Sequence, residues 1–235
     1  MPLISEAIAS FEGVPDHTNV AMIIGDHATL GNEGRTGADF GLIIQMERAG
    51  ETRYLVTLLQ AKRATSRKTS VHRIAGSSTQ LNLLAGTDTG AFLFYHAHGA
   101  PDGLGPTTKD ARSIAAAHAT SVDVVDDAVD FAAKVAVAAH QLFRTSVAHA
   151  MPGFGGADRR NDALRQLFNP NVPDLKVNDV LIARVGDHRL APRSVVNFKN
   201  EWRQAVHSHR RQVEDARSIA NGTRRDEQEP PIKAW

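Results

Sequence analysis

Two short apolar runs, separated by a polar turn, form the clearest pattern in the first hundred residues of this chain. Residues 40–44 read Phe-Gly-Leu-Ile-Ile, and residues 54–59 read Tyr-Leu-Val-Thr-Leu-Leu. Runs of this length, rich in aliphatic and aromatic side chains, are typical of β-strands. The polar residues 48–51, Arg-Ala-Gly-Glu, lie between them and predict a turn. The pattern therefore predicts a hairpin, in which the start of the first strand lies beside the end of the second.

Further elements are predicted on both sides of this hairpin. Apolar spacing and capping serines predict helices over residues 3–12 and from Ser77 or Ser78 to about Leu84. A strand is expected over residues 91–96, whereas the apolar run 20–24 fits either a strand or a buried helix. Loops are expected over residues 25–37 and, with basic character, 64–76. This order of elements is compatible with a mixed sheet flanked by helices.

The second half of the chain has a more helical pattern. The alanine-rich stretch 110–150 is expected to be mostly helical, with a break near residues 120–121. Breaks are also expected at 99–106 and 151–156, helices at 163–168 and 193–220, and a strand at 180–185. We therefore expect one α/β domain over residues 1–220, with a core at about 3–98 and a mainly helical extension at about 99–220. Residues 221–235 are expected to form a mobile tail.

Composition narrows the classes of protein that fit. The 235 residues suffice for one sizeable domain, and a hydrophobic content of 42% allows a packed core. The absence of cysteine excludes disulfides and zinc–thiolate sites. No apolar run approaches the roughly 20 residues of a membrane span, and the first residues do not resemble a secretory signal. We therefore expect a cytoplasmic protein that does not act in a membrane.

Charge is nearly balanced overall but unevenly distributed. A net charge of +1 excludes a generally basic protein that coats nucleic acid. Residues 60–73, however, contain five basic residues and no acid: Lys62, Arg63, Arg67, Lys68 and Arg73. Because this segment follows the second predicted strand, a phosphate backbone could lie beside that strand. The alternative interpretation is a basic loop that only faces solvent.

Polar residues lie at the two hairpin positions that pairing would bring together. Asp39 precedes the first strand, and Gln60 and Lys62 follow the apolar part of the second. Strand side chains alternate between faces, so Gln60 and Lys62 share one face. The hairpin would gather a carboxylate, an amide or backbone oxygen and an ammonium around one point, as metal-assisted phosphodiester hydrolysis requires. The alternative is that all three are ordinary polar residues at strand ends.

These residues resemble those of a known family. Asp39, Gln60 and Lys62 match the first acid, the second position and the lysine of PD-(D/E)xK nucleases, in the branch where glutamine replaces the second acid. Residues 32–39, Asn-Glu-Gly-Arg-Thr-Gly-Ala-Asp, resemble the signature that precedes this strand pair in bacterial nuclease-like proteins. Residues 78–84 and 91–95 resemble that group's glutamine-bearing helix and following core strand. The resemblance covers residues 30 to 98 and departs from most of the superfamily at Gln60.

The resemblance implies a restriction-endonuclease-like fold and a DNA endonuclease that requires Mg²⁺ or Mn²⁺. Asp39 and Glu33 would bind the metal, with help from the Gln60 side chain and the Ala61 carbonyl. Lys62 would polarise water or the scissile phosphate. Glu33 lies six residues before Asp39 in the predicted loop. Glu6, on the first predicted helix, is the rival for the role of the extra acid.

The expected nucleic-acid contacts are Arg63, Arg67, Lys68, Arg73 and Gln80. By resemblance, such proteins often serve bacterial defence against foreign DNA, and a homodimer or a partner defence protein is possible. The sequence does not distinguish DNA from RNA. The eleven histidines show no spacing that suits a shared metal ion. Two other functions stay open: a nuclease-like protein that binds nucleic acid without cutting, and an interaction protein whose motif is coincidental.

Overall fold

A computed structural model describes most of the chain but not all of it. The described residues are 19–26, 36–48, 51–71, 74–75, 78–96, 105–144, 151–167, 180–185 and, except for 203, 210, 213 and 217, 200–219. The chain forms two compact units, Met1–Ala191 and Pro192–Trp235. This division differs from the single domain expected over residues 1–220. The helix expected over residues 3–12 and the tail from 221 lie outside the described residues.

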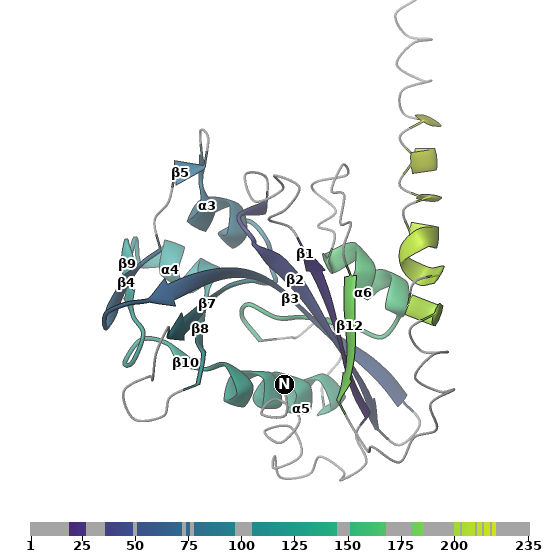
Figure 1. Ribbon diagram of the computed structural model, residues 1–235, viewed down its shortest axis with the longest axis horizontal. Coiled ribbons are helices and arrows are strands. Elements are labelled where there is room, and N and C mark those ends of the chain that lie inside the picture. The colour runs from purple at the N-terminus through teal and green to yellow at the C-terminus, as the bar shows by residue number, and fades with distance from the viewer. Residues whose placement is uncertain are drawn as a thin grey trace, which may run out of the picture. The chain divides into compact units, whose positions relative to one another are not determined.

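The first unit is built on a mixed sheet. Its strands run in the order β10-β8-β7-β3-β2-β1-β12, and β11 also pairs with β3 (Figure 1). The bounds are β1 Asn19–Asp26, β2 Phe40–Arg48, β3 Glu51–Ala64, β7 Gly90–His96, β8 Thr107–Asp110, β10 Val129–Asp130, β11 Gly155–Ala157 and β12 Val180–Val185. β3 and β7 are parallel, and the other pairs are antiparallel. The expected class, α/β with a mixed sheet flanked by helices, is confirmed.

Helices cover both faces of this sheet. They are α3 Gln80–Ala85, α4 Ala111–Ala116, α5 Phe131–Arg144 and α6 Arg160–Leu167. One apolar core joins Leu59 and Ala91 to α5, and the other joins Leu58 and Phe92 to α3 and α4. Neighbouring residues of a strand thus belong to different cores, as the alternation of strand side chains requires. Even-numbered residues at the end of β3 consequently face the side of α3 and α4.

The predicted hairpin is present. β2 pairs with β3 from Phe40 opposite Leu59 to Arg48 opposite Glu51. This last pair flanks the position at which the polar residues predicted the turn. β1, which the pattern left open between strand and helix, is a strand that pairs with both β2 and β12. The strands expected at 91–96 and 180–185 are confirmed as β7 and β12.

One expectation about the remaining elements was wrong. The stretch 64–76, expected to be a loop, contains β4 (Lys68–Ser70) and β5 (Ile74–Ala75). The alanine-rich stretch 110–150, described as far as residue 144, contains the helices α4 and α5 on either side of the expected break, and this break also holds β9 (Ser121–Asp123) and β10. β4 pairs with β9, and β5 pairs with β6 (Ser78–Thr79). These short strands depend on their pairing partners, so local patterns do not indicate them.

The extension contributes strands to the sheet as well as helices, because β8, β10, β11 and β12 all come from it. In the second unit, the described residues between 200 and 219 are helical, within the helix expected over 193–220. None of the helices in the described ranges is long and apolar enough to cross a membrane.

Candidate active site at the end of strand β3

Asp39 completes the β2–β3 ladder at the point where β2 begins. Its backbone N–H donates to the carbonyl of Leu59, with N and O 2.9 Å apart. Its side chain continues the pattern, because the backbone N–H of Ala61 donates to Asp39 Oδ2 at 2.8 Å. β3 extends past the last β2 partner, and the Asp39 carboxylate takes the place of the missing backbone oxygen. The register thus fixes this carboxylate beside residues 60 and 61.

Gln60 brings its amide to the same carboxylate. The residue is 2% exposed, and its Nε2 donates to Asp39 Oδ2 at 2.6 Å. The same nitrogen lies 3.5 Å from the carbonyl oxygen of Ala61. Gln60 Oε1 is buried and finds no hydrogen-bond partner within the described part of the chain. A buried acceptor of this kind is costly and needs an explanation.

Lys62 lies two residues further along β3, on the same face as Gln60. Its ammonium donates to Oε1 of Gln80 at 3.0 Å. Gln80 is the first residue of α3 and is 1% exposed. The structure therefore places Lys62 against the start of α3, on the sheet face that carries the Gln60 amide.

Gly37 connects the segment before Asp39 to the same helix. Its φ is +73°, in the left-handed region that glycine adopts without strain. A Cβ here would overlap the Gln80 carbonyl oxygen and lie 3.0 Å from the Leu84 nitrogen. The segment before β2 consequently packs directly on the backbone of α3. The sequence alone does not predict the positive φ of this glycine or its contact with α3.

The donor set of this site suits a hard divalent cation. The Asp39 carboxylate, Gln60 Oε1 and the Ala61 carbonyl are all oxygen ligands, which Mg²⁺ and Mn²⁺ prefer. In the structure, the Gln60 Nε2 hydrogens lie where Asp39 and Ala61 present oxygens. A rotation of the amide would turn Oε1 toward these two oxygens, where a bound cation would be the partner of all three.

The extra acid cannot be placed, since Glu33 and Glu6 both lie outside the described residues. Within the described ranges, no group of three or more histidine, aspartate or glutamate side chains could hold a metal ion. Among these residues, Asp39 is thus the acid of the site, and the other oxygens come from an amide and a backbone carbonyl.

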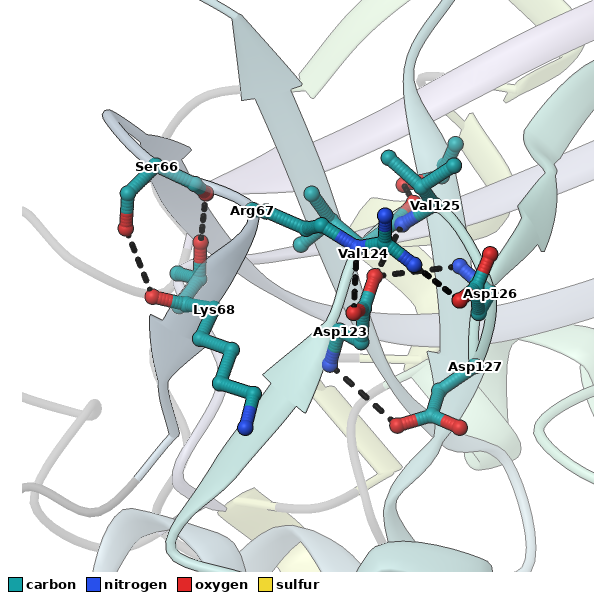
Figure 2. Close-up of polar contacts among 10 residues, drawn as sticks. Ser66, Arg67, Lys68, Asp123, Val124, Val125, Asp126 and Asp127 are labelled. Atoms are coloured by element: carbon teal, nitrogen blue, oxygen red, sulfur yellow. Dashed lines mark hydrogen bonds and ion pairs between the residues drawn. The ribbon is translucent and has the colours of Figure 1, made fainter.

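The basic segment after β3 is partly neutralised by a distant acidic turn. Arg67 Nε donates to Asp123 Oδ2 at 2.6 Å, and the guanidinium also pairs with Asp126 (Figure 2). The hydrogen bond from Arg67 lowers the pKa of Asp123 below its usual value, and the same bond raises the pKa of Arg67. The Asp123 backbone N–H donates in turn to Asp127 Oδ2 at 3.3 Å.

The other residues expected to contact nucleic acid differ in their exposure. Arg63 and Lys68 are exposed. Gln80 is buried and holds Lys62, so its side chain is not presented to solvent. Arg73 lies outside the described residues. Asp123 and Asp126 both bind Arg67, a contact that the sequence analysis did not predict.

Comparison of the chain with protein families, with curated proteins and with solved structures gave no match. The function is therefore inferred from the sequence and from the geometry of the site.

Proposed function

We propose that this protein is a metal-dependent nuclease that hydrolyses phosphodiester bonds of DNA with Mg²⁺ or Mn²⁺. The observation that carries the proposal is the contact among Asp39, Gln60 and Ala61: the Gln60 amide lies against the carboxylate and the Ala61 carbonyl oxygen, and its Oε1 is buried without a partner in the described chain. Lys62 on the same strand face adds the cation that phosphate chemistry needs.

In this proposal, Asp39, Gln60 Oε1 and the Ala61 carbonyl hold the metal, and Glu33 adds a second acid. The bound metal would polarise the phosphate and make a water more nucleophilic. Lys62 stabilises the negative charge that develops on the phosphate oxygens. In the net reaction, water adds to phosphorus, one phosphorus–oxygen ester bond breaks, and the leaving oxygen takes a proton.

The substrate is proposed from charge and from the resemblance. Arg63, near the end of β3, and Lys68, beyond that end, are both exposed and can bind successive phosphates. Arg67 contributes less because Asp123 and Asp126 already bind it. The resemblance to bacterial nuclease-like proteins supports DNA as the substrate and defence against foreign DNA as the role.

Nicking of supercoiled plasmid tests the proposal. The wild type should nick in Mg²⁺ or Mn²⁺ and stop in a chelator. Asp39→Asn should lose metal-dependent nicking, while its amide oxygen can still accept from the Ala61 N–H. Lys62→Ala should lose rate more than metal affinity. Comparable nicking by the wild type and Asp39→Asn would exclude this site, and a matched RNA substrate would show which nucleic acid is cut.

A second function, nucleic-acid binding without cleavage, is favoured by one observation. Asp39 Oδ2 already accepts two N–H bonds, so the site is electrostatically satisfied without a cation. In that case the protein would bind plasmid in a salt-dependent way, but no metal would support nicking.

A further inference from the structure

Three parts of the candidate site meet at the first residue of α3. Gln80 Oε1 accepts from the Lys62 ammonium, and the Gln80 carbonyl lies against Gly37. Gly37 belongs to the segment that leads to Asp39, whose carboxylate contacts Gln60. The start of α3 thus touches both the strand that carries Lys62 and the segment that carries Asp39.

A buried acceptor on Lys62 has a physical consequence. Lysine has a flexible stem, and its ammonium acts as a compact point charge whose position is set by its partners. The Gln80 oxygen is held by a residue 1% exposed, at the start of a helix whose Leu81 and Leu84 are also buried. It therefore restricts where the ammonium can lie.

The chemical type of the acceptor matters equally. An amide oxygen accepts a hydrogen bond without carrying a charge, so this bond does not offset the charge of the ammonium. A carboxylate at the same position would form an ion pair and offset that charge.

We propose that Gln80 is a positioning residue, which holds the Lys62 ammonium beside the Asp39–Gln60 cluster without neutralising it. This inference rests on the proposed nuclease function and replaces the direct nucleic-acid contact expected for Gln80. Gln80 would act only through Lys62 and would not touch the substrate.

Cleavage rates in a double-mutant cycle test the role in the reaction. Gln80→Leu should lower kcat by between about 10-fold and about 100-fold, with little change in KM or Mn²⁺ affinity, because the ammonium loses its position. In a Lys62→Ala background, the same substitution should change kcat by less than about twofold. An equal loss in both backgrounds would show a purely structural role and overturn the proposal.

The charge argument has its own variant. Gln80→Glu keeps the size and an acceptor oxygen but adds a negative charge beside Lys62. It should fold and still lower kcat, whereas activity equal to the wild type would overturn the claim that the acceptor must be neutral. Gln45→Leu is the matched control: Gln45 is also buried, at 6% exposure, but lies opposite Tyr54 further along the hairpin. Any effect of this control on kcat should be the same with and without Lys62.

Unfolding in urea decides the inference independently of activity. If Gln80 holds Lys62, the urea midpoint of Gln80→Leu should be lower than that of the wild type. Lys62→Ala should then lower the urea midpoint less in the Gln80→Leu background than in the wild-type background. Additive shifts would overturn the contact itself. Absence of cleavage by the wild type would refute the proposed function. Non-additive shifts of the urea midpoint would in that case still support the contact by which Gln80 positions Lys62. The same cycle decides the inference if Lys62→Ala cleaves too slowly to measure.

Discussion

In the proposed metal site, Gln60 would serve both with and without a cation. Its Nε2 lies 2.6 Å from Asp39 Oδ2, as in a charge-assisted hydrogen bond, which holds the carboxylate when no cation is bound. Its Oε1 is a hard ligand of the kind that Mg²⁺ accepts. A glutamate at this position would bind a cation more strongly but would repel Asp39 in its absence. In the proposed site, glutamine would therefore lower the affinity for metal and stabilise the metal-free state.

Gln60→Glu should reveal this exchange. Without metal, the variant loses a hydrogen bond to a charged group, which costs about 1.5–3 kcal/mol, and gains repulsion between two carboxylates. With metal, it should need less Mg²⁺ for half-maximal cleavage, because charge dominates the affinity of oxygen ligands. Urea unfolding with and without Mg²⁺, together with calorimetric titration, measures both effects. Indistinguishable titrations of wild type, Gln60→Glu and Asp39→Asn would mean that no metal centre exists here.

At the scale of elements, the contact between the segment before β2 and α3 depends on Gly37. Gly37→Ala should destabilise the fold by about 1–3 kcal/mol or more, because the residue has a positive φ and its Cβ would overlap backbone atoms of α3. It should also reduce cleavage, since relief of the overlap moves Asp39. Urea unfolding and plasmid nicking measure the two effects.

Gly86→Ala is the matched control for this substitution. Gly86 is exposed just after the end of α3. A Cβ added there would have the Leu83 carbonyl oxygen as its nearest neighbour, at 3.3 Å. This change should have a small effect on both stability and cleavage. Equal effects of the two substitutions would show that the close approach at Gly37 is not needed.

The pairing of β4 with β9 should depend on pH through Asp123. Arg67 lowers the pKa of this carboxyl in the folded state, so the ionised form stabilises the fold. The contribution is complete above the unfolded pKa of about 3.9 and is lost as pH falls through the lower folded pKa. Acid unfolding followed between pH 6 and pH 2 should therefore be less steep in Arg67→Gln than in the wild type. An unchanged profile would assign the acid sensitivity to other carboxyl groups.

Elements whose contacts are local in the sequence were predicted correctly, whereas elements that form by pairing with distant residues were not. The hairpin was predictable because its apolar runs and polar turn are continuous in the chain. β11 was not, since Gly155 and Gly156 carry no side-chain pattern and their strand exists only by pairing with β3. The break near residue 120 was expected, but β9 depends on β4, which lies about 50 residues earlier. Local periodicity contains no information on such pairs.

The site follows the same physical rule. The contact between Asp39 and Gln60 was predictable because strand register determines it once the hairpin is assumed. The acceptor for Lys62 was not, because Gln80 comes from a helix whose packing on β3 has no local signal. Arg67 was expected to bind phosphate as part of an acid-free segment, but its acids lie 56 and 59 residues away in sequence.

For the whole molecule, the paired state of Arg67 changes how binding should depend on salt. If nucleic acid follows the exposed basic residues, Arg63→Ala and Lys68→Ala should each flatten the slope of log affinity against log salt by about 0.9 on duplex DNA. Arg67→Ala should change the slope less, because phosphate must first displace Asp123 and Asp126. Binding titrations over a range of salt concentrations measure these slopes. An equal change for all three residues would show that the acidic turn does not compete with DNA.

The sheet order also sets a sequence of events during synthesis. Asp39 and Gln60 are 21 residues apart, so the contact between them can form soon after the hairpin leaves the ribosome. β12, which covers the outer edge of β1, is made much later, since it begins at Val180. Until then, β1 presents the unpaired edge of an apolar strand, Asn-Val-Ala-Met-Ile-Ile-Gly-Asp. Such an edge is a template for pairing with another chain, so nascent or truncated chains that lack β12 are the form of this protein most prone to aggregate.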